Sequence, residues 1–207
     1  MAPMSVLNEL PSKELFEQAA TELVIDPAMV EKDWYVTQVL TLMAHLNLPG
    51  YTIVFSGGTS LSKAFGLIKR FSEDVDFKVI SIQEPQSRKT LSDFKNAVAT
   101  ALKDAGFSID PENIKARDGN KFFSIEVDYS SRFDQMTGLR PHIQLEISVH
   151  SPELPPIHRP VQSLLGSLKK EVAEVESIAC IDPLETAADK LSALVWRLPM
   201  QNVAGLI

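Results

Sequence analysis

Apolar residues recur at helical spacing over residues 1–50. The first stripe consists of Leu15, Phe16, Ala19, Ala20 and Leu23, and it predicts a helix over 12–23. Asp26 followed by Pro27 then matches an N-cap with proline at the first helical position. Apolar positions continue at helical spacing to the break at Asn47–Gly50, so a second, longer helix is expected. We interpret both helices as a packing platform.

The pattern changes to strands at Tyr51. Tyr51–Phe55 is a β-branched and aromatic run typical of a buried strand. Asp74–Ile80 alternates charged and apolar residues in its first half, which predicts a strand with one exposed face. A helix is expected over Leu91–Ala105, and three further strands are expected over Phe107–Ile114, Phe122–Tyr129 and His142–Val149. Ser151–Pro160 carries four prolines and is expected to be a loop.

The end of the chain returns to a helical pattern. A short strand is expected at Val175–Ile181, and Asp182-Pro183-Leu184-Glu185 combines an N-cap, a first-turn proline and a glutamate at the third position. The apolar positions of this final helix form a broad face that we expect to pack on the core: Leu184, Ala187, Ala188, Leu191, Leu194 and Val195. The pattern therefore predicts one α+β domain, with a helical part over 1–50, a mixed-sheet core over 51–181 and a C-terminal helix over 182–207.

Composition and charge narrow the function classes. The chain has 207 residues, of which 44% are hydrophobic and 23% charged, as in an ordinary globular protein. It has neither an apolar run of about 18 residues nor a secretory start, so we expect a cytoplasmic protein without a membrane segment. The net charge of −7 argues against binding nucleic acid through bulk positive charge. The single cysteine, Cys180, lies in an apolar run and is expected to be a buried thiol.

A glycine pair follows the strand at Tyr51–Phe55. Gly57 and Gly58 would let the backbone approach a polyphosphate, because neither carries a Cβ. Thr59 and Ser60 add hydroxyl donors, and a short helix expected over Leu61–Phe65 would point its free N–H groups at the same place. A glycine pair alone is usually only a tight turn.

Two carboxylates follow the short helix that is expected after the glycine pair. Asp74 and Asp76 stand two apart on a predicted strand, so both side chains point to one face. Paired carboxylates suit one or two Mg²⁺ ions, which can activate an attacking hydroxyl and stabilise leaving pyrophosphate. Asp-x-Asp alone is most often an exposed strand edge, but the order strand, Gly-Gly-Thr-Ser, helix, Asp-x-Asp predicts a catalytic or nucleotide-binding site between Phe55 and Phe77.

These motifs resemble a known family. Gly57-Gly58-Thr59-Ser60-Leu61-Ser62-Lys63, followed by Arg70-Phe71-Ser72-Glu73-Asp74-Val75-Asp76-Phe77, is similar to the signature of the AbiEii/AbiGii-like nucleotidyltransferase toxins. Those proteins are the toxin halves of bacterial abortive-infection and toxin–antitoxin pairs, within the DNA polymerase β superfamily. Glu31–Gln38 resembles the upstream helix of the family, and Asp189–Leu194 resembles a later helix whose lysine contacts the nucleotide. The resemblance spans 25–198.

The resemblance implies a polymerase-β-like nucleotidyltransferase core with flanking helices. It further implies transfer of a nucleoside monophosphate from an NTP to RNA, notably tRNA ends, with Mg²⁺ or Mn²⁺ as cofactor and an antitoxin protein as partner. Carried over to this chain, Asp74 and Asp76 are the metal ligands, Lys190 contacts the nucleotide, and Gly57 and Gly58, with Thr59 or Ser60, hold phosphates.

Two further residues are candidates for the same site. A third carboxylate is usual in the superfamily, and Glu146 is the candidate because it lies out of phase with the apolar positions of its strand; an exposed surface acid is the alternative. Lys63 follows the glycine pair by one helical turn and would either reach phosphate or be solvated.

Two other functions remain open. A small-molecule nucleotidyltransferase, such as one that modifies an antibiotic, uses the same motifs and suits the acidic charge. A non-catalytic nucleotide-binding relative is the other alternative, because members of the family commonly continue to an arginine–aspartate motif, and this sequence reaches Ile207 without one. The motifs at Glu31–Gln38 and Asp189–Leu194 favour the RNA-directed toxin.

Overall fold

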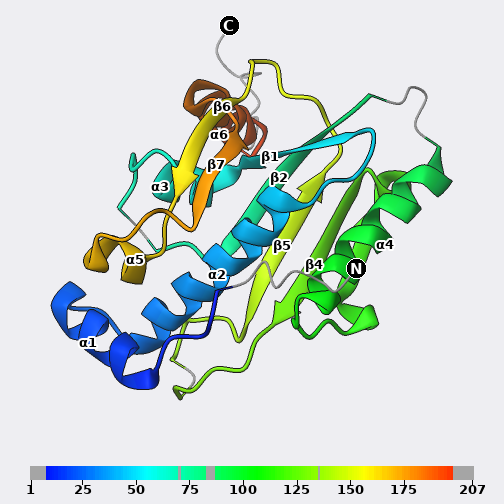
Figure 1. Cartoon of the computed structure of the whole chain (residues 1–207). Coiled ribbons are helices and arrows are strands. Elements are labelled where there is room, and N and C mark those ends of the chain that lie inside the picture. Colours follow the sequence, from blue (N-terminus) through cyan, green and yellow to red (C-terminus); the bar gives the residue numbers. More distant parts are fainter. Residues whose placement is uncertain (1–7, 70, 83–86, 135, 198–207) are drawn as a thin grey trace, which may run out of the picture.

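The computed structural model describes residues 8–69, 71–82, 87–134 and 136–197. It is an α+β fold, as expected: a seven-stranded mixed sheet with helices packed on it (Figure 1). The strand order is β3-β4-β5-β2-β1-β7-β6. The strands are β1 Tyr51–Ser56, β2 Asp74–Ser81, β3 Ile114–Arg117, β4 Phe122–Asp128, β5 His142–Ser148, β6 Ile157–Val161 and β7 Val175–Cys180.

The two longest helices lie across one face of the sheet. These are α2 (Pro27–His45) and α4 (Arg88–Asp104), which cover β4, β5 and β2 in Figure 1. The buried side chains of these helices and strands form one hydrophobic core, with Leu40, Leu102 and Leu145 fully enclosed. The opposite face of β2, β5 and β4 carries their polar positions. The chemistry of the molecule is therefore on the face away from α2.

Helix α2 begins at the predicted cap, and α1 (Lys13–Leu23) begins one residue after its predicted start. α1 starts after Ser12, whose hydroxyl accepts a hydrogen bond from the backbone N–H of Leu15 at 3.3 Å. α2 starts after Asp26, whose carboxylate accepts one from Ala28 N–H at 2.8 Å. α1 packs on the first part of α2 and on α5 (Leu164–Lys169), around Phe16 and Trp34 in a second apolar cluster.

One predicted strand was too long, and one predicted loop contains a strand. Phe107–Ile114 forms only an isolated bridge between Ser108 and Asp128, because Asp110 caps a 3₁₀ turn, η1 (Pro111–Asn113), before β3 begins. The turn between β3 and β4 is η2 (Asp118–Asn120). β6 lies within the stretch that was expected to be a loop. A strand can contain Pro160 there because β6 is at the edge of the sheet.

The glycine pair does not form a separate loop. α3 (Gly57–Lys63) begins directly after β1, four residues earlier than predicted. Gly57 makes the change of direction alone, with φ of 72°, in the left-handed region that favours glycine. Gly58, Thr59 and Ser60 are buried residues of this short helix.

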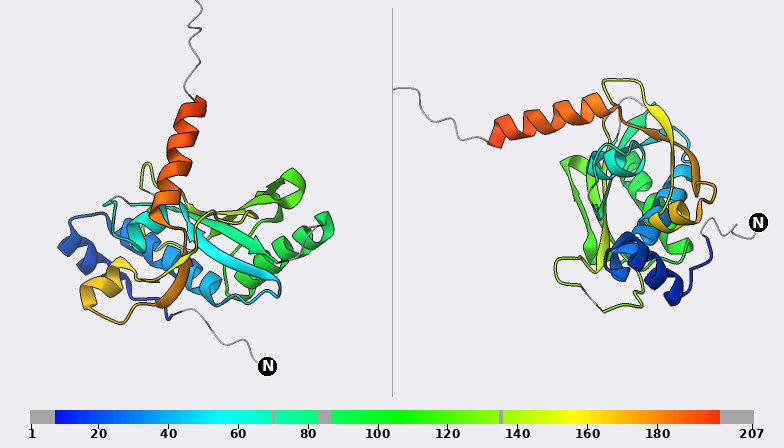
Figure 2. Two further views of the ribbon diagram at one scale, coloured as in Figure 1. Left: turned by 90° about the horizontal axis from the view of Figure 1, so that it is seen from above. Right: turned by 90° about the vertical axis from the view of Figure 1, so that its left-hand side faces the viewer.

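The C-terminal helix was predicted correctly, but its packing was not. α6 (Pro183–Arg197) leaves the sheet on the side opposite α2 and projects from the molecule (Figure 2). Leu184, Leu191 and Val195 are 73%, 64% and 68% exposed, and Glu185 and Thr186 are its buried residues. The apolar face therefore does not pack on the described core, because the helix axis points away from it. Residues 198–207, assigned to the same C-terminal part, lie outside the described residues.

Candidate active site

The two predicted carboxylates occupy the start of β2. Val75, Phe77 and Val79 of this strand are buried in the core, so Asp74 and Asp76 share the other face, as their spacing predicted. β5 runs parallel to β2 in a register that sets Glu146 beside Asp76. Since neighbouring strands are about 4.8 Å apart, these two carboxylates are close neighbours.

A cleft of about 500 Å³ opens over this pair. Its walls come from segments far apart in the sequence: Gly57 at the start of α3, Phe122 of β4, and Lys190 of α6, besides Asp76 and Glu146. This volume is within the range of small-molecule sites. Only the tertiary fold brings Lys190 to the two acids, because α6 begins at the end of the sheet nearest to them.

Asp76 has the most perturbed acid–base behaviour in the cleft. Burial raises the pKa of its carboxyl group to about 6, and the negative charges of Glu146 and Asp74 add to this rise. The ammonium of Lys190 acts in the opposite direction. A carboxylate that burial and neighbouring acids destabilise gains from a cation placed beside it. The cleft therefore offers carboxylate oxygens whose negative charge a bound cation would stabilise.

Asp74 is held differently from Asp76. Arg140 Nη1 lies 2.5 Å from Asp74 Oδ1, and Asp74 lines a neighbouring surface pocket with Gly138. Within the ranges that the structure describes, no three His, Cys, Asp or Glu side chains converge as a ready metal site. Asp76 and Glu146 fit a hard divalent cation as oxygen ligands. Asp74 does not line the cleft with them, and its Oδ1 is paired with Arg140.

Gly57 lies directly against Asp76. A Cβ built on Gly57 would stand 1.9 Å from Asp76 Oδ2 and 2.6 Å from Cγ, which no side chain could tolerate. The sequence suggested that the glycine pair leaves room for phosphate. The structure shows that Gly57 also leaves room for a carboxylate of the site itself, a reason that no local pattern contains.

Thr59 and Ser60 face the protein interior. The Thr59 hydroxyl donates to the backbone carbonyl of Asp74 and lies 2.6 Å from Ser72 Oγ. Ser60 is buried, and its hydroxyl lowers the pKa of the Cys180 thiol, which burial raises to about 11. Neither residue lines the cleft. Thr59 instead ties α3 to the first residue of β2, and so supports Asp74.

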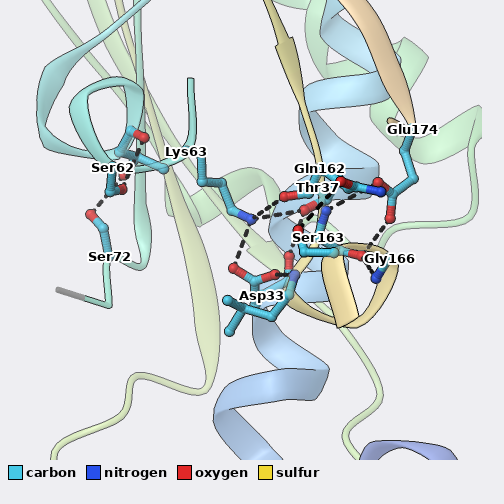
Figure 3. A network of polar contacts seen from close by, with 12 residues as sticks. Asp33, Thr37, Ser62, Lys63, Ser72, Gln162, Ser163, Gly166 and Glu174 are labelled. Carbon is cyan, nitrogen blue, oxygen red and sulfur yellow. Dashed lines mark hydrogen bonds and ion pairs between the residues drawn. The ribbon is translucent and has the colours of Figure 1, made fainter. Parts of the chain in front are cut away.

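Lys63 also points away from the cleft. Its ammonium lies 2.7 Å from Asp33 Oδ1 and donates to Thr37 Oγ1 at 3.1 Å, on α2 (Figure 3). It also donates to the carbonyl of Gln162 at 3.2 Å, and its side chain is only 9% exposed. Lys63 is thus neither a solvated lysine nor part of the cleft wall. It joins α3 to α2 by a buried ion pair.

An ion pair that sequence reasoning missed anchors α6. Lys78 Nζ lies 2.8 Å from Glu185 Oε1 and 2.9 Å from Asp189 Oδ2. The other oxygen of Glu185 accepts hydrogen bonds from the backbone N–H groups of Glu153 and Leu154, both at 3.0 Å. These contacts hold the first turns of α6 on β2, and they place Lys190 over the cleft. The available signal was the phase of Lys78, which continues the series of Asp74 and Asp76.

The resemblance at Glu31–Gln38 also has a structural basis. Lys32 is fully buried, and its ammonium lies 2.5 Å from Glu73 Oε2 and donates to the carbonyl of Arg140 at 2.7 Å. The same Glu73 oxygen accepts a hydrogen bond from Arg140 N–H at 2.9 Å. Through Lys32, helix α2 therefore holds Glu73, which precedes Asp74, and Arg140, which pairs with Asp74. Arg70, within the quoted motif, lies outside the described residues.

Comparison with known proteins gives a family match and solved structures of similar fold. Residues 41–203 match the model of the nucleotidyl transferase AbiEii toxin of type IV toxin–antitoxin systems. The fold is similar to that of MenT4, a nucleotidyltransferase toxin from Mycobacterium tuberculosis, with a TM-score of 0.55 and 16% sequence identity. The alignment covers 88% of this chain but 59% of MenT4, so the chain spans less than two thirds of that protein. No curated protein matches the sequence.

Proposed function

The chain belongs to the AbiEii family of nucleotidyltransferase toxins, and from this premise we propose that its cleft transfers a nucleoside monophosphate from an NTP to an RNA acceptor. The observation that carries the proposal is the convergence of Asp76, Glu146 and Lys190 on one cleft, with Gly57 shaped around Asp76. Two acids suit a metal ion, and one lysine suits a polyphosphate. An antitoxin protein is the expected partner, since the family model describes toxins of type IV pairs.

The proposed reaction consists of three changes at the acceptor and the NTP. The acceptor hydroxyl oxygen forms a bond to the α-phosphorus, the bond from that phosphorus to pyrophosphate breaks, and the hydroxyl proton leaves to a carboxylate oxygen or water. Mg²⁺ or Mn²⁺ held by Asp76 and Glu146 would supply positive charge at the reacting phosphate. Lys190 would neutralise phosphate oxygens from the α6 side of the cleft. Asp74 is proposed as a further metal ligand once Arg140 releases it.

The phosphate-holding roles expected around α3 are not equal in this arrangement. Gly57 lines the cleft, so its backbone is the part of α3 that we propose to contact phosphate. Thr59 and Lys63 are engaged elsewhere, with Asp74 and Asp33 respectively. We therefore assign them to support of the site, together with Gly58 and Ser60, which are buried in α3.

A small-molecule acceptor is the second candidate, favoured by the net charge of −7 and by the acidic character of the cleft. An RNA acceptor requires favourable contacts to phosphates. The described residues that line the cleft include two lysines, Lys78 and Lys190, against three acids, Asp76, Glu146 and Asp189. The motifs at Glu31–Gln38 and Asp189–Leu194, which resemble those of the RNA-directed toxins, favour RNA.

The test is incubation of purified protein with each labelled NTP, Mg²⁺ and total RNA, and with RNA omitted. We expect RNA to be labelled by wild type and by the surface controls Asp104→Asn and Lys103→Met on α4. Asp76→Asn and Lys190→Met should lose at least about 100-fold in rate, because each removes charge at the reacting phosphate. RNA labelling by Asp76→Asn at the wild-type rate would refute the site. Labelling only of small molecules would favour the second candidate.

A further inference from the structure

Phe122 is an aromatic side chain that the core does not use. It is the first residue of β4, and its side chain lines the cleft, whereas the adjacent Phe123 is completely buried. Alternation along the strand explains this difference. Phe122 belongs to neither apolar cluster of the described residues. Its flat, partly open ring therefore stands among the charged and hydroxyl groups of the cleft.

A cation lies on this ring. The guanidinium carbon of Arg117 is 4.0 Å from the Phe122 ring centroid, and the two residues are direct partners in the β3–β4 pairing. Arg117 is exposed, and in the part of the chain that the structure describes no carboxylate forms an ion pair with it. The guanidinium therefore lies over one face of a ring whose residue lines the cleft.

The strand register places Phe122 within the length of a nucleotide from Glu146 and Asp76. Phe122 pairs with Ser148 of β5, two residues beyond Glu146 on the same strand. With about 4.8 Å between strands and about 3.3 Å per residue, the Cα of Phe122 lies about 8 Å from that of Glu146 and about 12 Å from that of Asp76. A nucleoside whose hydroxyl or phosphate reaches the acids can therefore extend its base over Phe122.

We propose that Phe122 and Arg117 form a platform on which a nucleobase stacks. Aromatic rings and guanidinium planes both stack on bases with little sequence preference, because every base has a π face. The base would belong either to the NTP or to the terminal nucleotide of the RNA acceptor. This inference rests on the proposed function, and the same ring cannot serve both at once. Stacking of this kind changes affinity by about 10- to 100-fold per base.

The variants separate stacking from packing. Phe122→Leu keeps an apolar side chain but removes the ring, and Phe122→Trp restores an aromatic surface. Phe65→Leu is the control: the guanidinium of Arg159 lies 5.4 Å from the Phe65 ring centroid, and Phe65 does not line the cleft. Circular dichroism and thermal unfolding of each variant check that the fold is retained.

Binding is measured without turnover, using ATP, GTP, CTP and UTP, inorganic tripolyphosphate, and a short oligoribonucleotide. If the platform holds the NTP base, Phe122→Leu weakens NTP binding about 10- to 100-fold and leaves tripolyphosphate binding unchanged. If it holds the acceptor base, the loss appears with the oligoribonucleotide instead. Phe122→Trp should recover the affinity, and Phe65→Leu should match wild type.

Unchanged affinity of Phe122→Leu for every base-containing probe would overturn the platform. An equal loss for tripolyphosphate would overturn it too, because the ring would then act only through the shape of the cleft. If NTP binding depends on Phe122 but the protein transfers no nucleotide, the proposed function is wrong and the platform is supported. If the wild-type protein binds none of the probes, both the proposed function and the platform are wrong.

Discussion

Replacement of Gly57 by alanine tests whether the close approach of α3 to Asp76 shapes the site. The added Cβ would stand 1.9 Å from Asp76 Oδ2, 2.6 Å from Cγ and 2.9 Å from Cβ. Ordinary contact begins at 3.4 Å, so the carboxylate would have to retreat by about 1.5 Å. The side chain that must move is the one that we propose to hold the metal ion.

Two costs add in this variant. The backbone of Gly57 has a φ of 72°, and an alanine in the left-handed region is less stable by about 1–2 kcal/mol. Crowding a well-packed position adds about 1–3 kcal/mol. For activity, a displacement of about 1 Å at reacting groups costs about 100-fold, so kcat/KM should fall by at least that much.

Gly66→Ala is the matched control. Gly66 has a φ of 64°, and a Cβ there would have no neighbour within 4 Å. It therefore pays only the backbone cost. Urea denaturation of both variants should show a larger loss of unfolding free energy for Gly57→Ala, and nucleotide transfer should fall only in that variant. In an Asp76→Ala background the contacts at 1.9 and 2.6 Å disappear, so the extra loss should shrink.

Equal transfer rates in Gly57→Ala and Gly66→Ala would refute the reasoning. So would an extra loss of stability that persists unchanged in the Asp76→Ala background, because the carboxylate would then not be the obstacle. The comparison requires only purified protein, one denaturant and the transfer assay described above.

Glu185→Gln should lower the unfolding free energy by about 1–3 kcal/mol in urea, because it weakens the contact with Lys78 that anchors α6; it should also raise the KM for NTP, and an unchanged KM would show that α6 is positioned by other contacts. Asp76 has a pKa of about 6 when folded against an ordinary 3.8, so the folded state binds its proton more tightly. In metal-free buffer its stabilising contribution is complete below about pH 4 and is lost as pH rises through about 6, by up to about 3 kcal/mol; urea titrations should show this slope in wild type and not in Asp76→Asn. Burial raises the pKa of the Cys180 thiol to about 11, so iodoacetamide at pH 8 should modify urea-unfolded protein and spare the native one, and rapid native alkylation would contradict this burial.

Features that depend on neighbouring residues were predictable from the sequence. Helical spacing located α1, and spacing together with the cap at Asp26 located α2. The alternation of β2 put Asp74 and Asp76 on one face. The same phase argument put Glu146 out of the core, and the structure sets it beside Asp76. These inferences succeeded because side-chain direction along a helix or strand follows from its local geometry.

Features that depend on distant partners were not predictable. Lys63 follows the glycine pair closely in sequence, yet its ammonium pairs with Asp33 of α2. The apolar stripe of α6 resembled a packing face, but the anchor at Glu185 directs the helix away from the core. Periodicity reports which side chains share a face, and it contains no information on where the element's axis points.

The site itself shows the same division. The residue types available for metal and phosphate chemistry, and the faces on which they stand, followed from the order of residues along the chain. The family resemblance had grouped Glu146 and Lys190 with the two aspartates. The folded chain brings Asp76, Glu146 and Lys190 to one cleft, but it pairs Asp74 with Arg140, which no pattern indicated. The physical reason is that a charged side chain takes the partner that lies nearest in space, and strand order and register, set by packing over the whole sheet, choose that partner.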